Sequence, residues 1–210
     1  MSKTKKIISV ILAAGEARRM GKTKQLLPWG THTLIEHVID QHLQAKVSEI
    51  YIVLGADLEK IKKQIKNLPI NILENPDWKL GLSTSIVTAV HHIAKEKVEA
   101  DGILIALADQ PLLEADYLKA LIQIFNENPE KIVATAYEKK CGVPAVFPIS
   151  YLNNLQHLSG DKGASQLINA EKSNMIAINS GGKTTDIDTP EIYHQVYRIF
   201  GSVEKKQTLS

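Results

Sequence analysis

The sequence predicts an α/β protein in which helices cover both faces of a mostly parallel sheet, giving three layers. Apolar runs that resemble strands alternate along the chain with segments of helical periodicity, the order that builds parallel sheets. Residues 7–12 and 103–108 are apolar at almost every position, as expected for strands buried on both faces. A chain of 210 residues has room for one such domain and little more. We therefore expect a single domain over residues 1–200 and a flexible polar tail over 201–210.

The N-terminal half should contain three strands and two helices. After the first strand, a long glycine-containing loop runs to Thr31. Thr33 and Glu36 have the spacing of a capping box, and apolar side chains at helical spacing follow them, so a helix should begin there. In order, the expected elements are the strand 7–12, the helix 34–43, the strand 50–54, a charged helix ending near residue 67, and the strand 70–73.

The C-terminal half continues the alternation but is less regular towards its end. Ser83 can cap the first helix of this half, and the acid and proline at 109–111 break the apolar strand that follows the helix. In order, the expected elements are the helix 84–95, the strand 103–108, the helix 115–125, the strand 131–137, a helix near 163–171, the strand 175–179, and a last helix from about residue 190.

Composition excludes several classes of protein. The net charge of +2 gives no general argument for binding nucleic acid or a membrane surface. The single cysteine, Cys141, excludes an internal disulfide framework and a cysteine-based zinc site, and it fits a cytoplasmic protein. The apolar run 7–14 is too short to span a bilayer, and charged residues follow it where a signal peptide would have small ones.

The loop after the first strand is a candidate phosphate-binding segment. In parallel sheets, ligands bind beyond the carboxyl ends of the strands. Small residues at 13–15 allow a ligand to approach the backbone closely, and four cations follow at positions 18, 19, 22 and 24. The loop matches neither a Walker motif nor a dinucleotide fingerprint, so a solvated basic loop is almost as good an interpretation.

Two acidic segments are candidate metal-binding sites. Asp109 lies at the tip of a buried strand, where one carboxylate suits Mg²⁺, although a turn or cap role fits equally well. Asp186 and Asp188 are two residues apart in an extended segment and point the same way. We favour a metal role for Asp188 and a capping or surface role for Asp186. The alternative is that these acids belong to a helix cap, with Asp188 or Thr189 before Pro190.

Two further segments carry weaker signals. Residues 75–85 place a glycine and hydroxyls at the start of a helix, which can form an anion- or base-binding corner, although helix capping explains Ser83 better. Residues 158–164 contain Gly-Asp-Lys-Gly before a helix, which is a turn in most proteins but can bring Lys162 to an acceptor phosphate.

Together and in this order, these segments resemble the molybdenum cofactor cytidylyltransferase family, within the wider nucleotidyltransferases of Rossmann-like fold. Residues 12–15, 19–21 and 24–27 match a pattern that many nucleotidyltransferases share. Residues 75–78, 81–83, 142–145 and 159–164 are more specific to the molybdopterin branch. The resemblance covers residues 7–193, and it implies a three-layer αβα fold of the nucleotide-diphospho-sugar-transferase type.

The resemblance also implies roles for particular residues. Lys24 and Arg19 would hold the triphosphate as catalytic cations, with Lys24 on the α-phosphate, and Asp109 and Asp188 would bind Mg²⁺. Asp161 and Lys162 would bind the acceptor. The nucleotide would lie against residues of segments 12–15 and 75–85, namely Leu12, Ala13, Ala14, Gly15, Gly81 and Ser85. The substrates would be CTP and molybdenum cofactor, and a molybdenum hydroxylase is an expected transient partner.

Two departures from the family pattern remove no charged group. Ala17 stands where serine is usual, and Ala108 stands where many members have glycine. The alternatives are a guanylyl- or sugar-phosphate nucleotidyltransferase of the same fold, a non-catalytic carrier of molybdenum cofactor, and a regulatory domain that binds sugar phosphate. A carrier would not need both Lys24 and Asp109, so their joint presence favours the enzyme.

Overall fold

The computed structural model describes residues 5–138 and 140–201, and a seven-stranded sheet forms their centre. The strand order is β5-β4-β1-β6-β8-β7-β9, and β8 alone in this sheet runs antiparallel to its neighbours. Its members are β1 (Ile7–Ala13), β4 (Glu49–Leu54), β5 (Asn71–Glu74), β6 (Gly102–Leu107), β7 (Ile132–Ala136), β8 (Cys141–Pro148) and β9 (Met175–Asn179). The mostly parallel α/β sheet that the sequence predicts is therefore confirmed.

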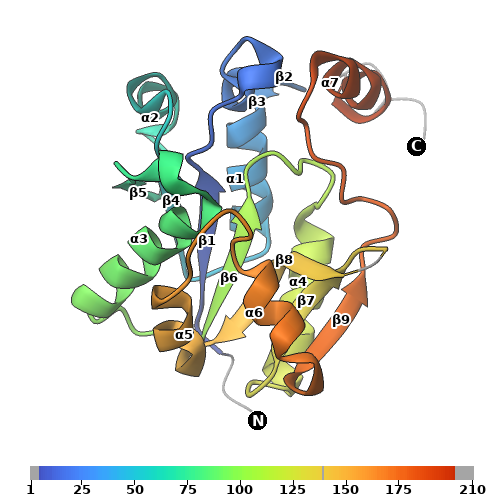
Figure 1. Ribbon diagram of the computed structural model, residues 1–210. Coiled ribbons are helices and arrows are strands. Elements are labelled where there is room, and N and C mark those ends of the chain that lie inside the picture. Colours follow the sequence, from blue (N-terminus) through green and yellow to red (C-terminus); the bar gives the residue numbers. More distant parts are fainter. Residues whose placement is uncertain (1–4, 139, 202–210) are drawn as a thin grey trace.

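Helices cover both faces of this sheet (Figure 1). One face packs against α3 (Leu82–Lys95), α5 (Leu152–Gln156) and α6 (Ser165–Ala170). The other face packs against α1 (Leu34–Gln44), α2 (Leu58–Ile65) and α4 (Ala115–Glu127). Successive side chains of a strand point to opposite faces, so Val10 enters the first of these cores and Ile11 the second.

A smaller unit lies beyond the carboxyl end of β1. It consists of the two-stranded ribbon β2 (Pro28–Trp29) and β3 (His32–Thr33), the helix α7 (Pro190–Val196), and the π-helical turn η6 (Tyr197–Gly201). Trp29 and Tyr193 are buried in its apolar cluster. This unit brings the C-terminal segment beside the N-terminal loop (Figure 1).

Several expected boundaries are confirmed, and some are wrong. The capping box of Thr33 and Glu36 is present, and β9 has the expected bounds. Ser83 does not cap α3, because that helix begins at Leu82 and the Ser83 hydroxyl is buried without a hydrogen-bond partner among the described residues.

The sequence-based prediction also missed strand β8. Glycine and proline within a segment usually indicate that it is not a central strand, and β8 contains Gly142, Pro144 and Pro148.

Gly201, the first residue of the expected tail, is packed into the fold. Its backbone is buried, and its carbonyl accepts a hydrogen bond from the Gly30 amide at 2.7 Å. The rest of the expected tail, residues 202–210, lies outside the described residues. Within the described ranges, no helix combines the length and the apolar character needed to cross a bilayer.

A buried pair between β1 and α1 makes stability depend on pH. Ser9 Oγ and His42 Nδ1 are hydrogen-bonded at 2.7 Å, and both side chains are buried. Burial lowers the pKa of His42 to about 3, so the ring stays neutral in the folded protein. Below the ordinary histidine pKa of about 6.5, the unfolded chain binds a proton that the folded chain does not.

We therefore expect the His42 contribution to be complete above about pH 6.5 and to be lost as the pH falls, by about 1.4 kcal/mol per unit, down to about pH 3. Urea unfolding at about pH 7, 6 and 5 measures this slope. The double variant Ser9→Ala/His42→Leu should lose less stability over the same range. Equal slopes in the two proteins would contradict the assignment.

Candidate active site

The loop after β1 leaves open space beside small residues. Ala13 and Ala14 are buried, whereas Gly15 is exposed, and a Cβ atom at Gly15 would meet no atom within 4 Å. Gln25 holds this loop from within, because its Nε2 donates hydrogen bonds to the Ala13 carbonyl at 3.2 Å and the Gly15 carbonyl at 3.4 Å. Gln25 lies in the matched segment 24–27, but the sequence analysis assigned it no role, since the pattern does not show that its side chain holds the loop.

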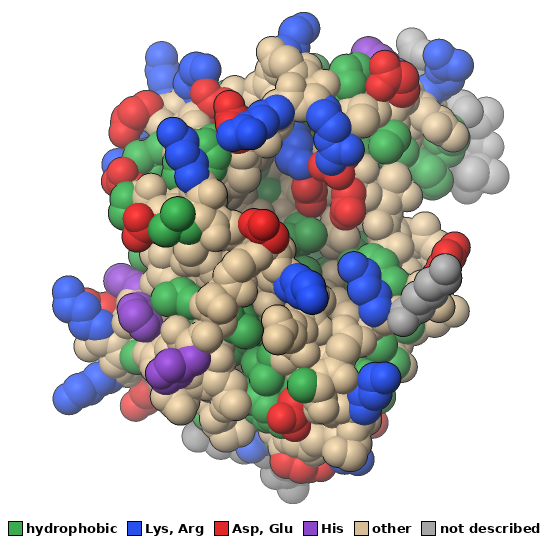
Figure 2. All heavy atoms as spheres, in the orientation of Figure 1, with side chains coloured by type: hydrophobic (Ala, Val, Ile, Leu, Met, Phe, Trp, Pro, Cys, Tyr) green, Lys and Arg blue, Asp and Glu red, His purple; other side chains and the backbone are tan. Residues whose placement is uncertain are grey.

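Lys24 lies between two carboxylates from distant parts of the chain. Its Nζ is 2.6 Å from Asp109 Oδ2 and 3.1 Å from Asp188 Oδ1, and its side chain is 12% exposed. Arg19 makes a third contact, with its guanidinium 3.0 Å from Asp188 Oδ2. Four residues singled out in three separate sequence motifs therefore meet at one point. Figure 2 shows a hollow on this face, with Lys and Arg side chains at its rim and carboxylates inside it.

Opposite charges in this cluster stabilise the charged forms of Lys24 and Asp188. Burial disfavours the Lys24 ammonium, but Asp109 and Asp188 outweigh burial, and the pKa of Lys24 is raised above its ordinary value. Burial likewise works against the Asp188 carboxylate, but hydrogen bonds and charge from Lys24, followed by Arg19, lower its pKa. Both shifts favour the charged forms of Lys24 and Asp188, and the cluster can neutralise an anionic ligand or hold a cation.

Asp109 keeps one oxygen unused. Its Oδ1 is buried and has no hydrogen-bond partner among the described residues, while Oδ2 contacts Lys24. The Ile187 amide donates to the Asp109 carbonyl at 2.9 Å, which fixes the C-terminal acidic segment against the end of β6. Within the described part of the chain, no group of three or more His, Cys, Asp or Glu side chains is arranged to hold a metal ion. Any ion here would depend on one or two carboxylates together with its other ligands.

The helix start at Gly81 contacts the Gly-Asp-Lys-Gly turn. Gly81 has a positive φ of 113°, and a Cβ there would lie 2.5 Å from Asp161 Oδ1, so this close approach requires glycine. The Ser83 amide donates to the Gly160 carbonyl at 3.1 Å. Ser85 lies behind this contact, where it is buried and its hydroxyl accepts from Asn75 Nδ2 at 3.0 Å. The proposed contact of Ser85 with the base remains a prediction.

A cavity of about 340 Å³ lies between these segments. Three of the expected site residues, Leu12, Asp161 and Lys162, line it. The other lining residues were not singled out as ligand-binding from the sequence, and they are Leu82, Ile86, Leu107, Gln110, Tyr137, Lys140, Gly142, Val143, Ala164, Ser165 and Asp186. The cavity adjoins the Lys24 cluster along the chain, because Gln110 follows Asp109 and Asp186 lies two residues before Asp188.

Asp186 is the residue whose position differs most from the expectation. It does not cap α7, because Thr189 does so through a 3.4 Å bond from the Ile192 amide. Instead, Asp186 lies exposed in the cavity wall, where its Oδ1 accepts from Gln110 Nε2 at 2.8 Å. Partial burial, followed by repulsion from Asp109, raises its pKa.

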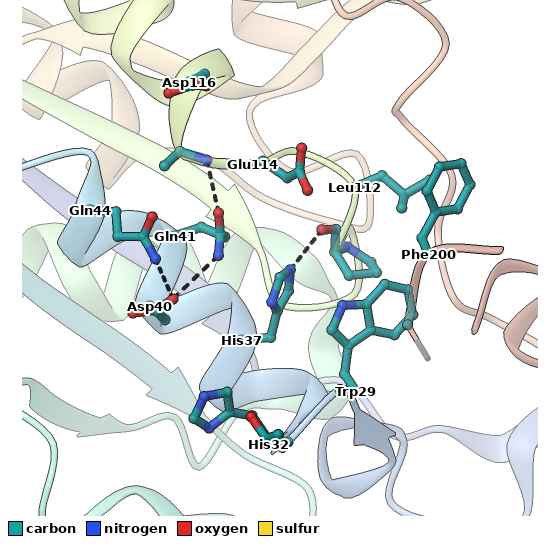
Figure 3. Close-up of a pocket in the computed structure, with 15 residues that line it drawn as sticks. Trp29, His32, His37, Asp40, Gln41, Gln44, Leu112, Glu114, Asp116 and Phe200 are labelled. Carbon is teal, nitrogen blue, oxygen red and sulfur yellow. Dashed lines mark hydrogen bonds between the residues drawn. The ribbon is translucent and has the colours of Figure 1, made fainter. Parts of the chain in front are cut away.

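A second cavity, of about 450 Å³, lies on the other side of the loop that follows Asp109 (Figure 3). Pro111 and Leu112 line it together with residues of α1 and the β2–β3 ribbon. In this cavity His37 Nε2 is 3.0 Å from the Pro111 carbonyl, and the Gln41 side chain accepts a hydrogen bond from the Ala115 amide. These contacts hold the loop from α1, so the cavity wall also positions the active-site segment.

The fold and this cluster define an α/β nucleotidyltransferase. A mostly parallel sheet, a small-residue loop at the end of β1, cations beside that loop and carboxylates from β6 and the C-terminal segment all meet at one edge. The model of the MobA-like NTP transferase domain matches residues 9–175, and the chain belongs to this family.

Curated relatives of this chain carry three different names. It is 29% identical to the purine catabolism protein PucB of Bacillus subtilis, over 91% of this chain and 96% of that protein. It is 29% identical to nicotine blue oxidoreductase of Paenarthrobacter nicotinovorans (92% and 96%) and 28% identical to the molybdenum cofactor cytidylyltransferase of Escherichia coli (87% and 91%). The family is therefore established, while the names alone do not select one substrate.

Solved structures agree on the fold. Rv0371c from Mycobacterium tuberculosis superposes with a TM-score of 0.77 at 24% identity, covering 93% of this chain and 99% of that chain. A manganese complex of the same protein has a TM-score of 0.72 at 23% identity and covers 92% of this chain and 99% of that one.

Proposed function

We propose that the protein transfers CMP from CTP to the terminal phosphate of molybdenum cofactor and releases pyrophosphate. The observation that carries the proposal is the position of Lys24 between Asp109 and Asp188, next to a cavity with Lys162 in its wall. A nucleotidyl transfer brings two anions together, and cations on both sides of the reacting centre reduce their repulsion. The similarity to the molybdenum cofactor cytidylyltransferase of Escherichia coli supports this acceptor and this nucleotide.

The carboxylates fit a Mg²⁺ ion. That ion takes one or two protein carboxylates and completes its shell with water and substrate phosphates. Asp109 offers a buried Oδ1 without a hydrogen-bond partner among the described residues. The Asp188 carboxylate lies nearby, because both carboxylates contact the ammonium group of Lys24. Asp109 and Asp188 would hold the ion, which would supply positive charge to the phosphates of the nucleotide.

The protein residues position the two substrates. An acceptor phosphate monoester has a second pKa near 6, so at neutral pH it is mostly a dianion and needs no general base. One of its oxygens forms a bond to the α-phosphorus, and the bond from that phosphorus to the oxygen bridging to the β-phosphate breaks. The pyrophosphate carries away the electron pair. Lys24 and Arg19 would stabilise the charge on the phosphates, and Lys162 would hold the acceptor phosphate.

The loop at the end of β1 supports a small, close-fitting contact with the nucleotide. Leu12 lines the cavity, Ala13 and Ala14 are buried beneath the loop, and Gly15 leaves the space above it open. Ala13 and Ala14 resemble the cytidylyl branch of the family, since the guanylyl branch usually has two glycines there. Gly81 brings the start of α3 against Asp161, which would place the nucleotide and the acceptor residues side by side.

Pyrophosphate release with CTP or GTP, in the presence of Mg²⁺ and verified active molybdenum cofactor, tests the proposal. We expect release with CTP that depends on both the cofactor and the metal. Release with GTP alone would overturn the choice of nucleotide and leave the reaction type standing. No release with either nucleotide would favour another acceptor or the carrier, and binding of the cofactor without turnover would identify the carrier.

A further inference from the structure

Three side chains in the wall of the 340 Å³ cavity form a hydrogen-bonded chain that the reaction above does not use. The Tyr137 hydroxyl donates to the Val143 carbonyl, so its oxygen is free to accept a hydrogen bond. Gln110 Nε2 donates to that oxygen at 3.0 Å and to Asp186 Oδ1 at 2.8 Å. Both N–H groups of the Gln110 amide are thereby used, and the chain ends on the Asp186 carboxylate.

This arrangement fixes the orientation of the Gln110 amide. In the flipped orientation, the amide oxygen would face a carboxylate oxygen, and two acceptors would oppose each other. In the orientation described, Oε1 is buried without a hydrogen-bond partner among the described residues, and Gln110 is only 4% exposed. An unpaired buried acceptor is unfavourable for folding, so the arrangement is better explained by ligand binding than by stability.

Of these three hydrogen-bonded side chains, Asp186 is the one whose carboxylate a ligand can reach. Gln110 occupies Oδ1, while the residue is exposed in the cavity wall and its carboxylate can accept further hydrogen bonds. The neighbouring wall is largely apolar, with Leu82, Ile86, Leu107, Val143 and the Tyr137 ring. Asp161, Lys140 and Lys162 also line the cavity, and Asp186 is the carboxylate that Gln110 holds against this apolar part. An apolar wall beside a carboxylate in a fixed orientation fits a flat heteroaromatic ring that carries N–H groups on its edge.

We propose that Asp186, positioned by Gln110 and Tyr137, determines acceptor specificity by binding the paired N–H groups of a 2-amino-4-oxo-pteridine ring. The inference rests on the proposed function, because it assigns a ring-binding residue to the acceptor of that reaction. A carboxylate accepts two adjacent N–H groups in a bidentate pair. A 2,4-dioxo-pteridine presents a carbonyl in place of the amino group, so an acceptor on the ring would face an acceptor on the protein.

The affinities of pterin, which is the 2-amino-4-oxo-pteridine, and lumazine, which is the 2,4-dioxo-pteridine, test this assignment. Both affinities can be measured by the fluorescence of the ring. The wild-type protein should bind pterin about tenfold or more tightly than lumazine, the effect of one charge-assisted hydrogen bond. Asp186→Asn should bring the ratio close to one, and Gln110→Leu should lower it by a smaller factor. Asp116→Asn is the matched control, because Asp116 pairs with Lys119 on the exposed surface of α4, and its ratio should equal that of the wild type.

Two results would overturn the inference. The first is an unchanged ratio in Asp186→Asn; if this variant also requires more Mg²⁺, Asp186 is instead a metal ligand. The second is binding of guanosine, but not of pterin, that depends on Asp186, since guanine carries the same pair of N–H groups.

Pyrophosphate release from CTP, measured on the same preparations, separates this inference from the proposed function. Release that persists while the pterin preference is insensitive to Asp186 overturns the inference alone. A preference that depends on Asp186, in a wild-type protein that releases no pyrophosphate, supports the inference and overturns the proposed function.

Discussion

Asp109→Asn should lower the rate of pyrophosphate release by roughly 10³, with a higher concentration of Mg²⁺ needed for half-maximal rate. The substitution keeps the size of the side chain but removes a charge from a position where one carboxylate oxygen is buried and unpaired and the other is 2.6 Å from Lys24. Release assays at several Mg²⁺ concentrations measure both effects.

Two controls keep that result interpretable. Asp116→Asn makes the same chemical change on the exposed surface and should have the wild-type rate and Mg²⁺ requirement. Thermal unfolding of Asp109→Asn shows whether the fold is retained, since Lys24 still contacts Asp188 in this variant. A folded Asp109→Asn protein with a rate within about threefold of the wild type would exclude the proposed metal role.

Lys24→Ala should lower kcat by roughly 10² to 10³, with a smaller effect on KM for CTP, if the ammonium acts mainly as charge develops in the transition state. The variant also leaves Asp109 and Asp188 facing each other without the cation between them, and their repulsion should lower stability. Steady-state kinetics separates kcat from KM, and urea unfolding measures the change in stability.

Lys63→Ala, on the exposed face of α2, removes the same charge away from the site and should leave both constants unchanged. A Lys24→Ala protein with normal kcat and normal KM would assign Lys24 to structural ion pairing alone. An increase in KM with normal kcat would show that Lys24 contributes equally to binding of substrate and transition state.

The sequence was informative where a short segment determines its own environment. Buried apolar strands and the capping box of Thr33 are local features, and the structure confirms them. The loop after β1 and the acid at the end of β6 could be found because parallel strands place their carboxyl ends along one edge. Lys24, Asp109 and Asp188 were selected separately, and the structure brings them together.

The rest depended on tertiary contacts that no local pattern encodes. Strand β8 has a composition that usually ends a strand, but it is stabilised between β6 and β7 by hydrogen bonds on both sides. Gln110 and Tyr137 are common residue types without any motif, and they acquire a role only because β7 and the loop after β6 lie at the same cavity. Asp186 has the sequence features of a capping residue, but the backbone gives that position to Thr189.

The ion pairs of Lys24 join parts of the chain that are 85 and 164 residues apart. Such distant partners meet late in folding, because closing long loops is entropically unfavourable until the sheet between them has formed. During synthesis, Arg19, Lys24 and Asp109 emerge long before Asp188, so a partly made chain holds three of the four members of the cluster. The matched family domain ends at residue 175, before the second carboxylate. A chain cut at that point would contain six of the seven sheet strands and only the first residue of β9, and it would lack Asp188. Completion of the C-terminal segment is therefore the step that completes the charged centre.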